Sequence, residues 1–170
     1  MSDLNNDLNI TVIDHPLVRH KLSLMREKDC STYKFRTLTK ELARLMAYEA
    51  SRDFEIETFP MQGWCGEITG EQIIGKTATI VPILRAGIGM LDGVLDLVPS
   101  ARVGFVGLYR DEETLQPVQY YFKVPKELGD RMVIAVDPML ATGNSSVAAI
   151  DLLKEAGAAN IRFLCLLAAP

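Results

Sequence analysis

The chain has no long apolar run, no positively charged start and no extended basic segment. Its first seven residues, Met-Ser-Asp-Leu-Asn-Asn-Asp, lack the basic and apolar regions of a signal peptide. Apolar stretches such as 161–170 are far shorter than the roughly 20 residues of a membrane-spanning helix. The 18 basic and 22 acidic residues give a formal net charge of -4, which disfavours binding to a nucleic-acid backbone. We therefore expect a cytoplasmic protein that binds neither membranes nor nucleic acid.

Residues for disulfides or metal sites are also scarce. The three cysteines, Cys30, Cys65 and Cys165, are odd in number and widely spaced, and only two histidines accompany them. This pattern suits neither a disulfide framework nor a zinc site. We expect ordinary, mostly buried thiols and no metal site built from protein ligands.

Two glycine fingerprints of nucleotide-binding proteins are missing. No Gly-x-x-x-x-Gly-Lys-Ser/Thr segment occurs, and Gly87-Ile88-Gly89 lacks the third glycine of a dinucleotide-binding turn. An ordinary kinase or dehydrogenase is therefore excluded as a first hypothesis.

The 170 residues are 48% hydrophobic, enough for one well-filled core, and we expect a single domain over 1–170. Periodic apolar residues predict a helix opening at Asp14-His15-Pro16 and an amphipathic helix capped by Ser31-Thr32. Alternation predicts a half-buried strand from Phe54 to Phe59 that ends at Pro60, followed by a glycine-rich loop region. Trp64 in that region is either an interface anchor or, as is more usual, a cover for the core.

The second half of the chain follows a different pattern. Nearly continuous apolar runs predict buried parallel strands at 77–84, 103–108, 132–136 and 161–167. A helix over 145–156, closed by Gly157 in a left-handed conformation, joins the last two. The fold class is therefore α/β, with a mainly parallel sheet flanked by helices and ligands expected beyond the carboxyl ends of the strands.

A long polar interval covers 109–129 and is rich in Tyr, Glu and Pro. We interpret it as a projecting arm or active-site flap, with a simple surface hairpin as the alternative.

The segment 133–146 carries the most chemistry, because an apolar strand leads through an acidic residue and a loop of small residues into a helix. Loop amides, the positive end of the helix and the hydroxyls of Thr142, Ser145 and Ser146 can hold a phosphate. Asp137, at the end of the strand, can accept hydrogen bonds from ribose hydroxyls; beside a phosphate it needs such partners or a cation.

The sequence motif Asp137-Pro138-Met139-Leu140-Ala141-Thr142-Gly143 resembles the diphosphate-ribose signature of phosphoribosyltransferases, in the form found in uracil phosphoribosyltransferases. Pro138 stands where most of the wider superfamily has a second acidic residue, and it marks this subgroup. Five further segments resemble the same family in wording and order: 15–22, 81–87, 92–95, 98–102 and 109–115. The likeness runs through the whole chain from about His15.

The resemblance implies a phosphoribosyltransferase-type fold with an N-terminal helical region. It also implies formation of UMP and diphosphate from uracil and 5-phosphoribosyl-1-diphosphate in pyrimidine salvage. Arg85 and its neighbouring backbone would bind the diphosphate, with a cis Leu84-Arg85 peptide, and Arg110 would reach it from the flap. Asp137 and the loop 138–145 would bind the ribose and the 5′-phosphate. Mg²⁺ would be held mainly by substrate oxygens, and no single catalytic side chain is assigned.

The resemblance further implies a homo-oligomer and activation by GTP in many bacterial members. The chain departs from the family at Asn144, where Gly is usual; we expect Asn to tolerate a left-handed backbone there, although its side chain would approach the phosphate. Family chains also continue beyond the match to Ala168-Ala169-Pro170 into a uracil-binding segment. An inactive module that binds 5-phosphoribosyl-1-diphosphate is therefore the alternative function, and RNA-binding regulation is disfavoured by the acidic charge balance.

Overall fold

The computed structural model describes residues 9–75, 78–111, 113 and 116–169. The described helices are α1 (Pro16–Met25), α2 (Thr32–Ala50), α3 (Ile88–Leu97), α4 (Asn144–Glu155) and the short 3-10 helix η1 (Leu128–Asp130). The described strands are β1 (Ile56–Gly63), β2 (Gly66–Ile73), β3 (Ala78–Leu84), β4 (Arg102–Val103), β5 (Phe105–Arg110), β6 (Pro117–Lys123), β7 (Met132–Val136), β8 (Met139–Leu140), β9 (Asn160–Leu164) and β10 (Leu167–Ala168). None of the helices in these ranges is long and apolar enough to cross a membrane.

The two N-terminal helices begin where the sequence predicts. The ring nitrogen Nδ1 of His15 accepts a hydrogen bond from the amide of Leu17 at 3.2 Å, and Pro16 opens the first turn of α1. The hydroxyl of Ser31 accepts from the amide of Lys34 at 3.2 Å and caps α2.

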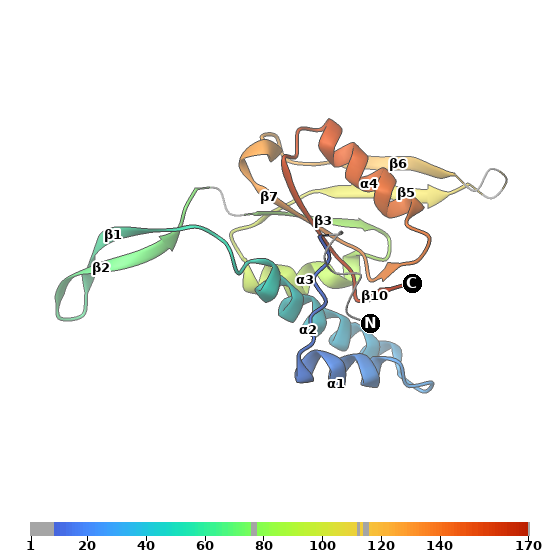
Figure 1. Cartoon of the computed structure of the whole chain (residues 1–170), viewed down its shortest axis with the longest axis horizontal. Coiled ribbons are helices and arrows are strands. Elements are labelled where there is room, and N and C mark those ends of the chain that lie inside the picture. Colours follow the sequence, from blue (N-terminus) through green and yellow to red (C-terminus); the bar gives the residue numbers. More distant parts are fainter. Residues whose placement is uncertain (1–8, 76–77, 112, 114–115, 170) are drawn as a thin grey trace.

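The central sheet has the order β6-β5-β3-β7-β9, with β4 paired to the start of β3. All neighbouring strands are parallel except β6, which runs antiparallel to β5. Helices α1 to α3 cover one face and α4 the other (Figure 1). Buried side chains of both layers, among them Leu42, Ile80, Ile134 and Leu153, fill a core on each side. The predicted α/β class with a mainly parallel sheet is confirmed.

Two predicted strands are divided. The run 103–108 begins in β4 and continues in β5, and the amide of Gly104 between them still donates to the carbonyl oxygen of Ile80 at 2.9 Å. The run 161–167 is likewise not one strand, since β9 ends at Leu164 and the chain turns to form β10 beside β8. The predicted helix over 145–156 is α4, and Gly157 follows it with φ +94°. Residue 77 lies outside the described residues.

The strand predicted over 54–59 is present as the first part of β1, but it does not end at Pro60: the segment from Ile56 to Ile73 is a two-stranded antiparallel hairpin, here called the arm. Figure 1 shows it projecting from the body. Pro60 does not end a strand but lies inside β1, opposite Thr69, which is possible because each strand of an isolated hairpin has a free edge. The glycine-rich stretch is not a loop, and Trp64 at the tip is fully exposed, so it does not cover the core.

The interval 109–129 contains the outer strand of the sheet. Strand β6 pairs with β5 from Phe105↔Lys123 to Arg110↔Pro117, with an irregularity at Gly107 and Leu108. Residues 112, 114 and 115 of this interval lie outside the described residues. The role of 109–129 as a flap stays a prediction.

Candidate functional site

Two loops meet at the carboxyl edge of the sheet. Strands β3 and β7 are neighbours, and Pro82 pairs with Val136 near their ends. The Leu84-Arg85 peptide that follows β3 is cis, as predicted. A Cβ added at Gly87 would lie 2.2 Å from the carbonyl oxygen of Val136. Gly87 is therefore required for the loop after β3 to approach the loop after β7.

Asp137 directly follows β7 and is half-buried. Its amide donates to the carbonyl oxygen of Leu164 at 3.1 Å, and its Oδ1 accepts from the amide of Met139 at 3.2 Å. Burial raises the pKa of the Asp137 carboxyl, and the Met139 hydrogen bond offsets this only in part. The carboxylate thus has unfilled acceptor capacity, which ribose hydroxyls would satisfy.

The loop after Asp137 is held by β10. Met139 pairs with Leu167 and Leu140 with Ala168 in a short parallel ladder. The carbonyl of Pro138 accepts from the amides of Leu166 and Leu167 at 3.2 Å each, and the carbonyl of Leu140 accepts from the amide of Ala169 at 2.8 Å. The first half of the predicted phosphate loop is therefore a paired segment rather than a free loop.

The second half of the loop delivers the chain into α4. Gly143 precedes the helix with φ +81°, a left-handed conformation that suits glycine. Asn144 is already the first residue of α4 and has no positive φ, so the expected left-handed role of Asn is wrong. Its side chain is exposed at the helix start, where unpaired amides and the helix dipole favour an anion.

The three hydroxyls predicted to bind the phosphate differ in their exposure. Together with the loop 138–145, they form the proposed phosphate cradle. Thr142 is exposed and Ser145 is half-buried, so both remain accessible. Ser146 is 8% exposed and packs into the body of the protein. Participation of the Ser146 hydroxyl in phosphate binding stays a prediction, and Ser146 is the least accessible of the three.

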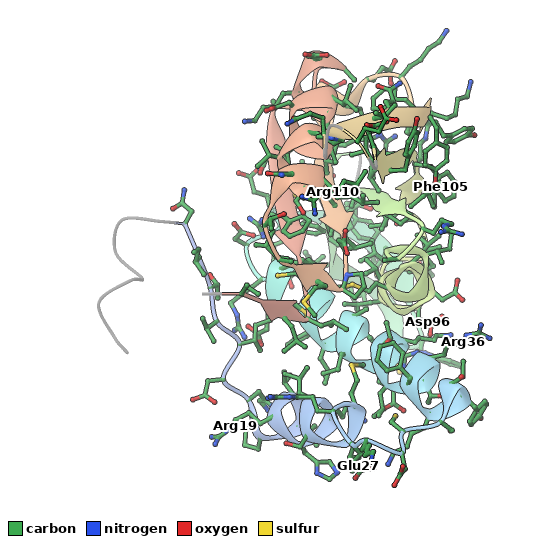
Figure 2. The ribbon with its side chains drawn as sticks, turned by 90° about the vertical axis from the view of Figure 1, so that its right-hand side faces the viewer. Arg19, Glu27, Arg36, Asp96, Phe105 and Arg110 are labelled. Carbon is green, nitrogen blue, oxygen red and sulfur yellow. The ribbon has the colours of Figure 1, made fainter. Side chains whose placement is uncertain are left out.

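The two predicted arginines follow neighbouring strands. Arg85 comes directly after β3 and Arg110 ends β5, and both side chains are exposed. Figure 2 shows Arg110 over the sheet, far from α1, which carries Arg19. Because β3 and β5 are parallel neighbours, both arginines lie at the carboxyl edge that also carries Asp137.

Cys165 is a neighbour of the site that the sequence analysis did not predict. It follows β9 as Asp137 follows β7, and these strands are adjacent. Burial, and in second place the charge of Asp137, raise the pKa of its thiol. No signal in the sequence marked this position, because the apolar run 161–167 continues past Cys165.

The cysteines are free, but their placement differs from expectation, since Cys65 is exposed at the tip of the arm and Cys30 and Cys165 are half-buried. The described residues contain no group of three or more His, Cys, Asp or Glu side chains able to hold a metal ion.

A parallel sheet with an acidic residue and a helix N-terminus at its carboxyl edge is the arrangement with which many α/β proteins bind phosphorylated sugars or nucleotides. A hypoxanthine-guanine phosphoribosyltransferase from Bacillus anthracis has the same fold, with a TM-score of 0.58 at 15% identity over 79% of this chain and 69% of its own. The AQ2163 protein from Aquifex aeolicus is more similar, with a TM-score of 0.87 at 36% identity over 94% of this chain and 76% of its own.

The sequence model of the family described as uracil phosphoribosyltransferase matches residues 12–170. Uracil phosphoribosyltransferases from Paracoccus denitrificans and Levilactobacillus brevis are 62% and 54% identical over 162 and 159 residues, which cover 95% and 94% of this chain and 77% and 76% of theirs. The chain belongs to the uracil phosphoribosyltransferase family.

Proposed function

We propose that this chain transfers the phosphoribosyl group of 5-phosphoribosyl-1-diphosphate to uracil, giving UMP and diphosphate in pyrimidine salvage. The observation that carries the proposal is the meeting of the Arg85 loop and the Asp137 loop at one edge of the sheet, enforced by Gly87. Membership of the family supports the assignment of the reaction. The meeting of the two loops supports the assignment of the substrate site.

Asp137 accepts hydrogen bonds from the ribose hydroxyls. Its half-buried carboxylate already has one amide partner, and the incoming hydroxyls replace the water that burial removes. The 5′-phosphate lies against Pro138, Met139, Leu140, Ala141, Thr142, Gly143, Asn144 and Ser145. The amides at the start of α4 and the hydroxyls of Thr142 and Ser145 are its donors.

Arg85 and Arg110 bind the diphosphate. Negative charge grows on this group as its bond to ribose C1 breaks, and guanidinium groups stabilise it through paired hydrogen bonds. The uracil nitrogen attacks C1 from the other side. Catalysis is largely positioning together with stabilisation of the leaving group, so no proton-transferring side chain is assigned.

Mg²⁺ fits this site through substrate oxygens, because Asp137 is the acidic residue of the cradle and one carboxylate does not form a cage. When bound with the substrate, the ion neutralises diphosphate charge. On family membership alone we further propose a cytoplasmic homo-oligomer, activation by GTP, and one domain over 1–170 with a flap at 109–129.

A second candidate is a module that binds 5-phosphoribosyl-1-diphosphate without turnover. Every site residue proposed above is assigned to this substrate and none to uracil, and this is the reason for the second candidate.

The test is UMP formation from radiolabelled uracil, alongside calorimetric binding of 5-phosphoribosyl-1-diphosphate with Mg²⁺. Asp137→Asn is the matched control. Turnover that depends on Asp137 supports the enzyme, and binding without turnover supports the module. A chain that neither binds nor reacts contradicts both.

A further inference from the structure

We propose that this chain binds a nucleotide in a second site, a basic and aromatic hollow at the amino edge of the central sheet. The hollow lies where β4, the start of β5 and the end of β6 meet, and its volume is about 430 Å³. Phe105 and Tyr121 line it, together with Arg102 and Lys123. Figure 2 shows Phe105 beside the sheet, far from α1. Small-molecule sites usually have volumes of about 300–1,000 Å³, so the hollow is large enough for such a ligand.

The hollow is separate from the proposed substrate site. Phe105 begins β5 and Arg110 ends it, and the strand between them spans about 17 Å. Arg110 belongs to the carboxyl edge of the sheet, where Arg85 and Asp137 also lie. Lys123 lies opposite Phe105, at the other edge. A ligand in the hollow therefore leaves the substrate site free.

The two cations of the hollow have no acidic partner. Arg102 and Lys123 are exposed and form no ion pair within the described part of the chain. Lys40 and Arg44, by contrast, share the carboxylate of Asp96. The described residues that line the hollow include neither aspartate nor glutamate, although the whole chain has a net charge of -4. Two unpaired cations in a concave surface favour the binding of an anion.

Two glycines of the β5 region shape the hollow and expose its ring. Tyr121 lies opposite Gly107, which has no side chain to cover it, and Tyr121 is 46% exposed. At Gly104, an added Cβ would lie 2.9 Å from a methyl group of Val124 and 3.2 Å from the carbonyl oxygen of Lys123. Gly104 therefore allows Val124, which lines the hollow, to lie close to the start of β5.

A nucleotide matches both parts of this surface. Its base can stack on the aromatic rings, and its phosphate can form charge-assisted hydrogen bonds with arginine and lysine. An inorganic anion would leave the rings without a partner, and an uncharged ring compound would leave the cations without one. Pyrimidine and purine nucleotides share this chemistry, so UMP and GMP are both suitable probes.

Hydrogen–deuterium exchange locates the ligand. With UMP or GMP added to the whole chain, we expect slower exchange of the amides in 102–106 and 121–125. Protection by both probes or by one of them supports the site and identifies the base that it takes. Protection confined to 137–145 places the nucleotide in the substrate site alone and overturns the proposal. A chain that shows protection at the hollow but forms no UMP contradicts the proposed function and not this site.

Titration of the protection at 102–106 and 121–125 gives the affinity of the hollow itself. We expect the nucleotide to bind at least about tenfold more tightly than inorganic phosphate or uridine, because each of these makes only one kind of contact. If inorganic phosphate binds as tightly as the nucleotide, the rings take no part and the nucleotide assignment is wrong.

Substitutions separate the two kinds of contact. Arg102→Gln with Lys123→Gln should weaken nucleotide binding about tenfold to a hundredfold. Tyr121→Leu should weaken it about tenfold and leave the affinity for inorganic phosphate unchanged.

The matched control removes two exposed cations elsewhere, Arg26→Gln with Lys154→Gln, and should have no effect. Parental affinity for the nucleotide in both hollow variants would overturn the proposal. If a variant fails to fold, the comparison of nucleotide, inorganic phosphate and uridine on the parent chain still decides.

Discussion

Adding one methyl group at Gly87 should separate the two loops of the site. The Cβ of alanine would lie 2.2 Å from the carbonyl oxygen of Val136 and 2.7 Å from the amide nitrogen of Ile83. Ordinary contact begins near 3.4 Å, so backbone must move by about 1.2 Å, and neither neighbour is a flexible side chain. Overpacking of this kind costs about 3 kcal/mol, or roughly 6–12 °C in melting temperature. A displacement of about 1 Å at a reacting centre costs on the order of a hundredfold in rate.

Two glycines of α3, the helix that follows Gly87, serve as controls. Gly93→Ala would bring a Cβ to 2.1 Å from the carbonyl oxygen of Lys40, against α2 and away from the site. It should lose similar stability but keep the substrate affinity of the folded protein. Gly89→Ala meets only a Thr39 methyl at 3.5 Å and should be neutral or slightly stabilising. Thermal melts, calorimetric binding of 5-phosphoribosyl-1-diphosphate and UMP formation distinguish the three. Parental binding and activity in Gly87→Ala would refute the reasoning.

Four further predictions concern the Asp137 loop and the neighbouring Cys165. Asp137→Asn should weaken binding of 5-phosphoribosyl-1-diphosphate about tenfold to a hundredfold, because hydrogen bonds to a charged acceptor are lost; equal calorimetric affinity would contradict its role. Burial raises the pKa of the Asp137 carboxyl in the folded protein above its usual 3.8. Folding therefore favours the protonated carboxyl, and the stability that this form contributes is lost as pH rises through the folded pKa. Asp137→Asn should therefore raise the melting temperature at pH 7, and the gain should shrink as pH falls towards 3.8; a gain independent of pH would refute this cause. Ser145→Ala should weaken binding of 5-phosphoribosyl-1-diphosphate about tenfold. If the affinities for this substrate and for inorganic phosphate are both unchanged, Ser145 does not bind the 5′-phosphate. The Cys165 thiol should be alkylated more slowly than that of exposed Cys65, and faster in Asp137→Asn, as peptide mass spectrometry would show.

The sequence predicted the body of the fold because its signals are local. Apolar runs such as 132–136 lie in the centre of the sheet, and Ser31 caps α2 through a side chain three residues from its partner. The loop into α4 was also readable, since a strand, an acidic residue and small residues follow one another directly.

The arm could not be predicted by the same rules. Pro60 and three glycines signal a loop when each strand is assumed to lie in a buried sheet, but a free edge tolerates proline. The division of 161–167 was hidden because Cys165 and Leu166 are as apolar as the strand before them. The hydrogen bonds that hold the continuation of the chain, from the amides of Leu166 and Leu167, go to Pro138, far away in sequence.

The pairing of β8 with β10 determines when the site can form during synthesis. The loop that follows Asp137 owes its shape to residues 166–169, which are made after it. A nascent chain synthesised only as far as α4 already contains every proposed phosphate-binding residue. It lacks the residues whose amides bond to the carbonyls of Pro138 and Leu140. During synthesis the loop 138–145 should therefore stay flexible until β10 is made, and phosphate binding before then would carry the entropic cost of ordering it. The ability to bind phosphate should appear in one late step.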